Sequence, residues 1–381
     1  LGFFHERVNL IVDWYKKVSK DMLMSLQLPS YMGTSGNASS ALAAPMGNYG
    51  DIENKGWEIS LNTHPLIGAF EWDSDFQISF NRNKLRALDG TANAQIVGYG
   101  QWSDVVSVTN VGESLYNFYG YVCDGVYEDL EDLQTSAKPA KYPADGVFNR
   151  TNTVWVGDIK YKDLNGDGVI DENDRTNIGS PLPKFTFGWT NTFRYKNFDL
   201  SLFINGSYGN KVFNYLGMKL THMNSPWSNQ LNTVLDRAQI VPIDPNKDYS
   251  AGVVVNGVTI YNWYDDITNV RVANAGATIP RASIQDPNDN DRISDRYIED
   301  GSYIRLKNIT LGYTFPGKII KKWGLDNLRV YANIQNLLTI TGYSGYDPEI
   351  GASTASANVY GLDNGRYPSP TVYSFGLNVS F

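Results

Sequence analysis

The clearest chemical pattern in the sequence is an acidic, glycine-containing stretch, Asp163-Leu-Asn-Gly-Asp-Gly-Val-Ile-Asp-Glu-Asn-Asp174. Oxygen-bearing side chains recur at alternate positions and a glycine occupies the sixth position, as in the EF-hand calcium loop. Because Ca²⁺ takes roughly six to eight oxygen ligands, this spacing predicts a calcium site. The expected ligands are Asp163, Asn165, Asp167, the carbonyl group of Val169, Asp171 and Asp174.

This acidic loop departs from the EF-hand in two respects. Asp174 stands where a glutamate usually closes the loop, so its bidentate reach is shorter, and neither flank has the pattern of an EF-hand helix. We therefore expect an isolated calcium clip that rigidifies a loop. An Asx-rich turn that holds no metal is the alternative.

A second candidate site is a group of aromatic residues in the same part of the chain. Flat aromatic rings stack on the CH-rich faces of sugars, so these side chains predict a carbohydrate contact. The alternative is that they pack in a loop core or form an aromatic girdle at a membrane interface. The residues are Trp102, Tyr116, Tyr119, Tyr121 and Tyr127.

Other chemistry is poorly represented in the sequence. The histidines His5, His64 and His222 are scattered, and the single cysteine, Cys123, cannot form an intrachain disulfide. No Gly-x-Ser-x-Gly elbow, P-loop or histidine-based triad occurs, so we assign no catalytic residue and do not expect an enzyme. A net charge of -8 disfavours a nucleic-acid partner.

The elements that must position these loops are strands with one apolar and one polar face. The last stretch, 371–381, alternates strictly and ends on an aromatic residue, which suits a sheet between lipid and water. A soluble sandwich gives the same alternation, but its chain rarely ends on the exposed phenylalanine of such a strand. The apolar face consists of Tyr373, Phe375, Leu377, Val379 and Phe381.

Seven further stretches show the same alternation. In one of them the acidic residues Glu71, Asp73 and Asp75 would be costly inside a sandwich core but suit a water-filled lumen. Lys196-Asn197 has the composition of a tight hairpin turn, and a slip of the pattern near Asn308 indicates a bulge. The expected strands run over about 2–15, 57–62, 70–81, 185–195, 198–204, 302–315 and 328–335.

The connections between these strands alternate between short and long along the chain. Transmembrane barrels place short turns on the periplasmic side and long loops outside, so the alternation predicts an all-β fold, a transmembrane antiparallel β-barrel with long extracellular loops. An aromatic content of 13% fits the girdles of such a barrel. Residues 84–184 leave room for one more pair of strands. The short links are 64–69, 196–197 and 316–326, and the long ones 16–56, 84–184, 208–300 and 339–370.

Several stretches in this order resemble the SusC/RagA branch of TonB-dependent outer-membrane transporters, specifically the C-terminal part of its barrel. Together they span nearly the whole chain. They are Lys20-Asp-Met-Leu with Pro29, Ile52-Glu-Asn-Lys-Gly-Trp-Glu58, Phe118-Tyr-Gly-Tyr-Val-Cys-Asp-Gly125, Asp163-Leu-Asn-Gly-Asp-Gly-Val-Ile170, Ser302-Tyr-Ile-Arg-Leu-Lys-Asn-Ile-Thr-Leu-Gly-Tyr313, Leu328-Arg-Val-Tyr-Ala-Asn-Ile-Gln-Asn-Leu337 and the terminal strand.

The resemblance implies that residues 1–381 form a single C-terminal portion of a plugged barrel of about 22 strands in a Gram-negative outer membrane. It implies a plug and a TonB box outside this chain, coupling to TonB, and a SusD-like surface lipoprotein as a partner. It also implies uptake of an oligosaccharide or a peptide, of which we expect an oligosaccharide. The apolar face of the terminal strand resembles the signal for barrel assembly in the membrane.

Two alternatives remain at the level of the sequence. One is a self-contained barrel of eight strands, the smallest natural closure, although the absence of an initiator Met and of a signal segment before Leu1 indicates a piece of a longer chain. The other is a secreted, calcium-dependent, carbohydrate-binding β-protein. The second alternative predicts a protein that stays soluble without detergent.

Overall fold

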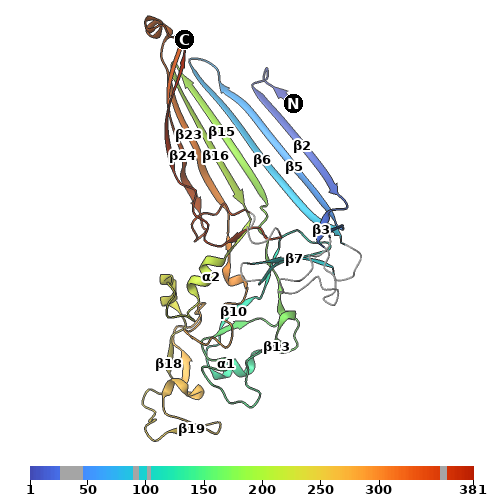
Figure 1. Ribbon diagram of the computed structural model, residues 1–381, viewed down its shortest axis with the longest axis vertical. Helices are drawn as coiled ribbons and strands as arrows, with labels where there is room; N and C mark the ends of the chain where they lie inside the picture. The colour runs from blue at the N-terminus through green and yellow to red at the C-terminus, as the bar shows by residue number, and fades with distance from the viewer. Residues whose placement is uncertain (26–45, 89–93, 101–103, 352–357) are drawn as a thin grey trace.

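The main element of the fold is a curved wall of antiparallel strands (Figure 1). The computed structural model describes residues 1–25, 46–88, 94–100, 104–351 and 358–381. The wall is a nine-stranded sheet in the order β1-β2-β5-β6-β15-β16-β23-β24-β26. Its strands are β1 Gly2–Phe3, β2 Val8–Ser19, β5 Asp51–Leu66, β6 Phe70–Ala87, β15 Phe185–Tyr195, β16 Phe198–Tyr208, β23 Tyr303–Thr314, β24 Asn327–Thr341 and β26 Val372–Ser380.

The structure confirms all of the expected strands and corrects their limits. The first one begins later, because Phe4, His5 and Glu6 have positive φ angles and form a turn between β1 and β2. β5 and β6 are longer than the apolar alternation predicts. Their added ends are still paired, and Ile52 faces Leu85 in a buried position, so the ladder continues beyond the alternating part.

The wall does not close on itself. β26 lies at one edge and β1 and β2 at the other, with no pairing between these edges among the described strands (Figure 1). A barrel is closed only when its first and last strands pair, so the self-contained eight-stranded barrel is wrong. The chain instead forms part of a barrel wall. None of the helices in the described part of the chain is long and apolar enough to cross a membrane.

One face of the wall is apolar and exposed. On the edge strand β26 the side chain of Phe375 is 85% exposed, and Trp14 on β2 is 58% exposed. Between neighbouring strands the rings pack against one another, as in the stacked pair Phe76 and Phe187, whose centroids are 6.2 Å apart. Continuous apolar packing across strands is the surface that a lipid-facing wall requires.

The opposite face carries the expected acids, and they are paired across strands. Asp73 accepts hydrogen bonds at 2.5 Å from Arg194 and lies 2.6 Å from Nδ1 of His64. Asp75 accepts a hydrogen bond at 2.6 Å from Asn62. The sequence predicted a lumen lining of acids, and the structure adds that these acids also join adjacent strands.

The predicted slip near Asn308 is confirmed as an irregularity in the ladder. Pairing between β23 and β24 moves from Leu306–Leu338 to Asn308–Gln335, so two residues of β24 oppose one of β23. Asn336, in the bulged segment, has a φ of 53°, a left-handed conformation that asparagine tolerates well.

Two polar residues interrupt the apolar face without breaking its hydrogen bonding. Ser74 and Asn191 face each other across β6 and β15 and are 9% and 5% exposed. The indole of Trp189 donates to Ser74 Oγ at 2.9 Å, and the indole of Trp72 donates to Asn191 Oδ1 at 3.0 Å. In lipid an unsatisfied polar group is costly, so the two indoles make this polar pair tolerable.

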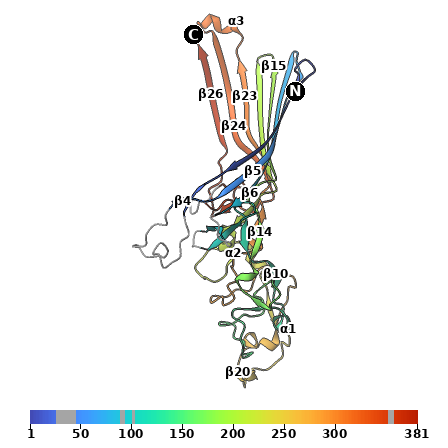
Figure 2. The same cartoon turned by 90° about the vertical axis from the view of Figure 1, so that its right-hand side faces the viewer.

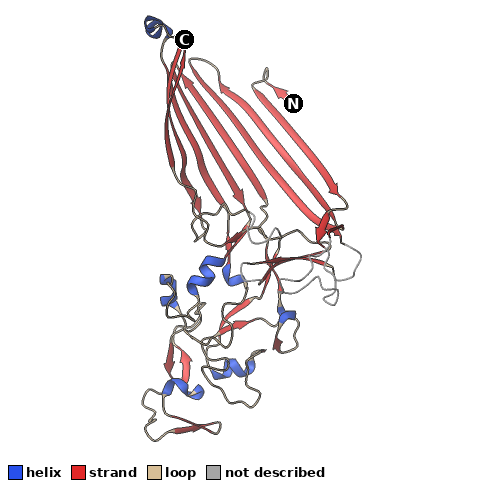
Figure 3. Cartoon of the chain, viewed as in Figure 1, coloured by secondary structure: helices blue, strands red, loops and turns tan. Residues whose placement is uncertain are grey.

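The described parts of the four long connections gather at one end of the wall and the short connections lie at the other (Figures 1 and 2). We call the described residues between 94 and 184, 209 and 302, and 342 and 371 the loop region. It contains short strands and short helices only (Figure 3). Its strands are β7 Gln95–Tyr99, β8 Val105–Asn110, β9 Phe118–Gly120, β10 Cys123–Val126, β11 Lys138–Pro139, β12 Ile159–Tyr161, β13 Val169–Ile170, β14 Thr176–Gly179, β17 Lys211–Asn214, β18 Ile240–Pro242, β19 Val253–Val255, β20 Val258–Ile260, β21 Val270–Val272, β22 Ile298–Asp300 and β25 Leu362–Asp363.

The remaining elements are short. The small hairpin formed by β3 and β4 lies between β2 and β5 in the chain, and α3 and η7 lie in the connection between β23 and β24. Their bounds, with those of the helices of the loop region, are β3 Leu23–Ser25, β4 Met46–Asn48, α1 Leu130–Thr135, η2 Glu172–Asp174, α2 Tyr215–Thr221, η3 Asn232–Asp236, η4 Trp263–Asp265, η5 Ile267–Asn269, η6 Asp295–Tyr297, α3 Gly317–Ile320 and η7 Lys321–Trp323.

The expectation of another pair of barrel strands within residues 84–184 is wrong for the described residues. β7, β8, β9 and β14 form a separate four-stranded sheet. These strands are too short for a membrane, where a spanning strand needs about 9–11 residues. In β8 the consecutive residues Val106 to Thr109 are all buried, so both of its faces pack inside the loop region.

Long connections that are far apart in sequence share hydrophobic cores. The larger core joins residues from 126–170 with residues from 238–277, and a smaller one joins 106–118 with 213–218, 297 and 359–362. The loop region is therefore folded, and each connection supplies packing partners for another. The larger core consists of Val126, Tyr127, Leu133, Val154, Trp155, Val156, Ile159, Tyr161, Ile170, Ala238, Ile267, Val270, Val272 and Ala277.

We predict that Trp72→Phe in the full-length protein lowers the free energy of unfolding by about 1–3 kcal/mol, because Asn191 Oδ1 loses its donor in an apolar environment. Denaturant unfolding in detergent measures the change. The double variant Trp72→Phe/Asn191→Leu should recover most of the loss, and the exposed Trp14 provides the control as Trp14→Phe. Equal stability of Trp72→Phe and the unchanged protein would contradict this account.

Candidate functional site

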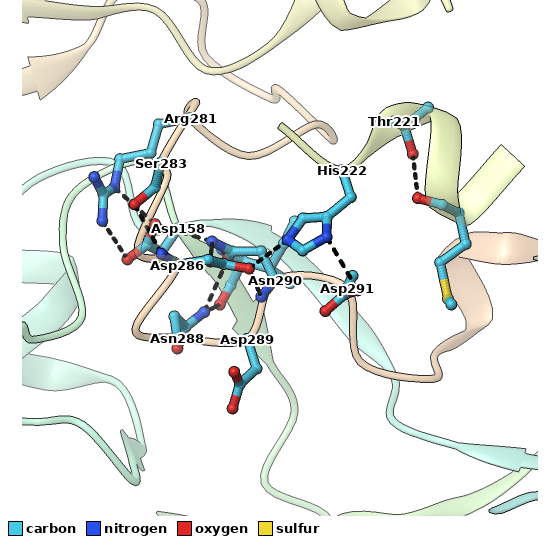
Figure 4. A network of polar contacts seen from close by, with 12 residues as sticks. Asp158, Thr221, His222, Arg281, Ser283, Asp286, Asn288, Asp289, Asn290 and Asp291 are labelled. Carbon is cyan, nitrogen blue, oxygen red and sulfur yellow. Dashed lines mark hydrogen bonds and ion pairs between the residues drawn. The ribbon is translucent and has the colours of Figure 1, made fainter. Parts of the chain in front are cut away.

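A buried polar network joins the connections of the loop region (Figure 4). The carboxylate of Asp158, which is fully buried, accepts hydrogen bonds from Arg281 at 2.7 and 3.2 Å and from Asn290 at 3.1 Å. Asn290 also receives the backbone N–H of Ile159 at 2.7 Å on its side-chain oxygen. The ion pair and the amide together satisfy groups that would otherwise be costly to bury.

The same network reaches α2 through His222, which follows that helix directly. His222 Nε2 lies 2.7 Å from Asp286 Oδ2, and its Nδ1 lies 3.1 Å from Asp291 Oδ2. His222, Asp286 and Asp291 each offer one possible metal-ligand atom, and these atoms lie within 4.8 Å of one another. Within the described ranges, no other set of three histidine, cysteine, aspartate or glutamate residues does so. Because both ring nitrogens already face carboxylates, the geometry fits an imidazolium that joins the end of α2 to the segment around Asp286 and Asp291 better than a metal ligand.

The electrostatics of this bridge depend on pH. Burial by itself would lower the pKa of His222, but the hydrogen bonds to Asp286 and Asp291 outweigh it and raise the pKa to about 9. For Asp291, burial opposes ionisation, yet the interactions with His222 and Lys219 lower the pKa of its carboxyl group. The charged pair is therefore the form that the folded loop region favours near neutral pH.

We predict that His222 stabilises the fold fully below pH 6.5 and that this contribution is lost as the pH rises through about 9, because the folded-state pKa lies above the ordinary histidine pKa of 6.5. Thermal unfolding of the full-length protein at both ends of this range measures the effect. His222→Gln should remove most of the difference, whereas the exposed His5→Gln should leave it intact. An unaltered pH profile in His222→Gln would refute the assignment.

The acidic loop is held by its own backbone. Asp163 accepts the N–H groups of Gly166 and Gly168 at 2.6 and 2.7 Å, and its pKa is lowered chiefly by the hydrogen bond from Gly168. Asp167 accepts the N–H of Val169 at 2.9 Å, and Asn165 that of Asp167 at 3.0 Å. This exposed arrangement leaves lone pairs on several oxygens, so the donor set suits a hard cation such as Ca²⁺.

The closing residue of the acidic loop has a different role from the one expected. Asp174 is buried, and its two oxygens accept the backbone N–H groups of Leu164 and Asp171, both at 2.8 Å. Asp171 and Asp174 form a capping box around η2. Calcium binding to the acidic loop therefore stays a prediction, in which Asp163, Asn165 and Asp167 carry more of the coordination than Asp174.

We predict that the purified full-length protein contains calcium that a chelator removes, and that Asp163→Asn lowers the calcium content. Elemental analysis before and after chelation measures it. Asp248→Asn is the control, because Asp248 likewise accepts a backbone N–H group, that of Ser250 at 2.8 Å, in a loop turn. Absence of calcium from the untreated protein would rule out the clip and favour the Asx-rich turn.

The aromatic candidates are not all in one place. Tyr127 is 1% exposed in the larger core, where a sugar ring cannot reach its face. Tyr116 packs against Tyr360, with the ring centroids 6.1 Å apart. Tyr119 and Tyr121 both lie beside the guanidinium of Arg175, at 4.9 and 5.9 Å from their ring centroids. Trp102 lies outside the described residues.

The structure brings one aromatic candidate and one candidate calcium ligand into the same pocket. This pocket of about 390 Å³, which we call the tyrosine pocket, contains Tyr121 and Asp171. Sugar contact by Tyr116, Tyr119 and Tyr121 stays a prediction. The other lining residues are Asp104, Val105, Ala140, Ile170, Glu172, Arg175, Asp289, Arg292 and Ile293.

One buried polar network was missed by sequence reasoning. The network around Asp158, Arg281 and His222 joins residues more than a hundred positions apart in some pairs, so no local spacing reveals it. The only sequence signal is the Asx-rich stretch Asp286-Pro-Asn-Asp-Asn-Asp291. The terminal strand has its expected apolar face exposed at the edge of the wall, and its role in assembly stays a prediction.

Comparison with known proteins places this geometry in a family context. No protein-family model matches the chain. TonB-dependent receptor P3 of Formosa agariphila is 32% identical over 389 residues, and TonB-dependent receptor SusC of Bacteroides thetaiotaomicron is 27% identical over 384 residues. Both alignments cover 100% of this chain but only 33% and 31% of those relatives. The chain thus spans about a third of the length of the curated relatives it matches.

Solved structures share the fold over the whole chain. The RagAB peptide transporter matches 100% of this chain and 34% of that chain with a TM-score of 0.65 at 20% identity. The RagAB peptide importer in the closed-closed state gives a TM-score of 0.64 at 19% identity. At such identities these structures establish the fold.

A curved antiparallel wall with one apolar face and long folded loops at one end defines a segment of an outer-membrane β-barrel. The matches confirm the resemblance to SusC/RagA-type TonB-dependent receptors that the sequence motifs indicated. The chain is similar to about a third of such a receptor, and receptors of this kind are outer-membrane proteins.

Proposed function

We propose that this chain is the C-terminal portion of the barrel of a TonB-dependent importer that takes up a large nutrient, an oligosaccharide. The observation that carries the proposal is the open wall itself: one face suits lipid, the other has a polar lining, and relatives named TonB-dependent receptor match over its whole length. A wall of this kind needs further strands to satisfy its edges in lipid.

The partners follow from the same proposal. A plug and a TonB box in the remainder of the receptor would couple uptake to TonB, and a SusD-like surface lipoprotein would cover the loop region. The likeness to RagAB, whose name denotes a two-part peptide transporter, supports the partner but not the substrate. In this orientation the loop region is extracellular and the short turns are periplasmic.

We predict that cells lacking the receptor fail to take up a labelled oligosaccharide that wild-type cells import, and that loss of TonB has the same effect. Uptake by whole cells measures this, and purification of the receptor from the outer membrane should recover a surface lipoprotein. Re-expression of the full receptor is the control. Uptake that continues without TonB would overturn the proposal.

A further inference from the structure

A second pocket in the loop region differs from the tyrosine pocket in charge. It has a volume of about 440 Å³, and no carboxylate stands among the described residues that line it. The tyrosine pocket, in contrast, has four acidic residues in its lining. The second pocket, which we call the arginine pocket, is lined by Arg150, Trp155, Arg237, Ala238, Gln239, Ile240, Val241, Tyr264, Arg281 and Ala282.

The floor of the arginine pocket is fixed in place. Arg281 is held by its ion pair with Asp158, and its backbone N–H donates to the carbonyl of Gly157 at 2.8 Å. Gly157 has a φ of +87°, and a Cβ atom there would lie 2.7 Å from Ile240 and 3.2 Å from Arg281. The backbone approaches this closely only because glycine has no side chain, so the floor is preorganised.

The charges of the arginine pocket are incompletely neutralised. Asp158 neutralises Arg281, and Asp265 lies 2.9 Å from Nε of Arg150. Arg237 makes a long hydrogen bond of 3.5 Å to the carbonyl of Val234 and, within the described part of the chain, no ion pair. The pocket thus keeps a surplus of positive charge in a chain whose net charge is -8.

An aromatic ring stands next to this charge. The guanidinium carbon of Arg150 is 5.0 Å from the centroid of the Tyr264 ring, and Tyr264 is 40% exposed. A uronic acid carries its carboxylate directly on the sugar ring. One unit can therefore place its CH-rich face against Tyr264 and its carboxylate against a guanidinium, whereas a glutamate side chain offers no such rigid pair of groups.

We propose that the arginine pocket binds the carboxylate-bearing unit of an acidic oligosaccharide, with Arg237 and Arg150 as the anion-recognising residues and Tyr264 as the ring contact. This assignment rests on the proposed function as an oligosaccharide importer and specifies its substrate class. Arg281 is a positioning residue that fixes the floor through Asp158.

The test is binding of tetragalacturonate to the full-length receptor purified in detergent, measured by calorimetry. Its neutral methyl ester and tetraglutamate are the comparison ligands. Arg237→Gln should weaken tetragalacturonate binding by about ten-fold or more, the loss expected for one charged hydrogen bond. The control is Arg271→Gln, which removes the same charge from an exposed position on β21, the strand that pairs with β18. This variant should bind tetragalacturonate as tightly as the unchanged receptor does. Equal thermal unfolding of the two variants shows that both are folded.

Each outcome bears on the proposal. Binding of tetragalacturonate that needs Arg237 but not Arg271, and that the methyl ester does not reproduce, supports it. No binding of tetragalacturonate, or equal loss in both variants, overturns it, and stronger binding of tetraglutamate overturns the assignment to a glycan. Uptake by cells distinguishes the two proposals. If TonB-dependent uptake is the same with and without the Arg237→Gln change, only the role of the arginine pocket is refuted. If the pocket binds tetragalacturonate but uptake does not depend on TonB, the proposed transport is refuted.

Discussion

Backbone hydrogen bonding in lipid is the constraint on which the rest of this structure depends. Without water, each N–H and C=O group of a spanning strand needs a partner in a neighbouring strand, and the ladder from β2 to β26 supplies it. The same requirement explains the indole donors of Trp72 and Trp189, which satisfy a polar pair on the apolar face. The same requirement means that the open edges of the wall need further strands as partners in lipid.

The loop region is stabilised differently from the wall, because its side chains form a packed hydrophobic core. Residues from 126–170 bury their side chains against residues from 238–277, so two connections on opposite sides of the β15–β16 hairpin in the chain fold as a unit. Polar contacts reinforce this union. Arg281 pairs with Asp158 of another connection, and His222 pairs with Asp286 and Asp291, which lie further along its own connection. A rigid loop region is a suitable support for pockets, since its side chains are held by neighbours from several segments.

The two pockets of the loop region differ in the charges of the residues that line them. The tyrosine pocket combines Arg175 and Arg292 with several acids beside the acidic loop, whereas the arginine pocket has guanidinium groups and no carboxylate in its lining. The two surfaces therefore suit different ligand groups, the first a cation or a ligand of mixed charge and the second an anion.

The sequence by itself determined the strands of the wall, the turn at Lys196-Asn197, the irregularity near Asn308 and the sorting of short and long connections, because side-chain alternation and turn chemistry are local properties. It also indicated the acidic loop and the family. Tertiary structure alone decided that the described residues between 88 and 184 add no strand to the wall, that Tyr127 is a core residue and that Asp174 caps a turn. The arginine pocket and the His222 bridge belong to this second group, since they exist only where packing brings side chains from distant parts of the chain together.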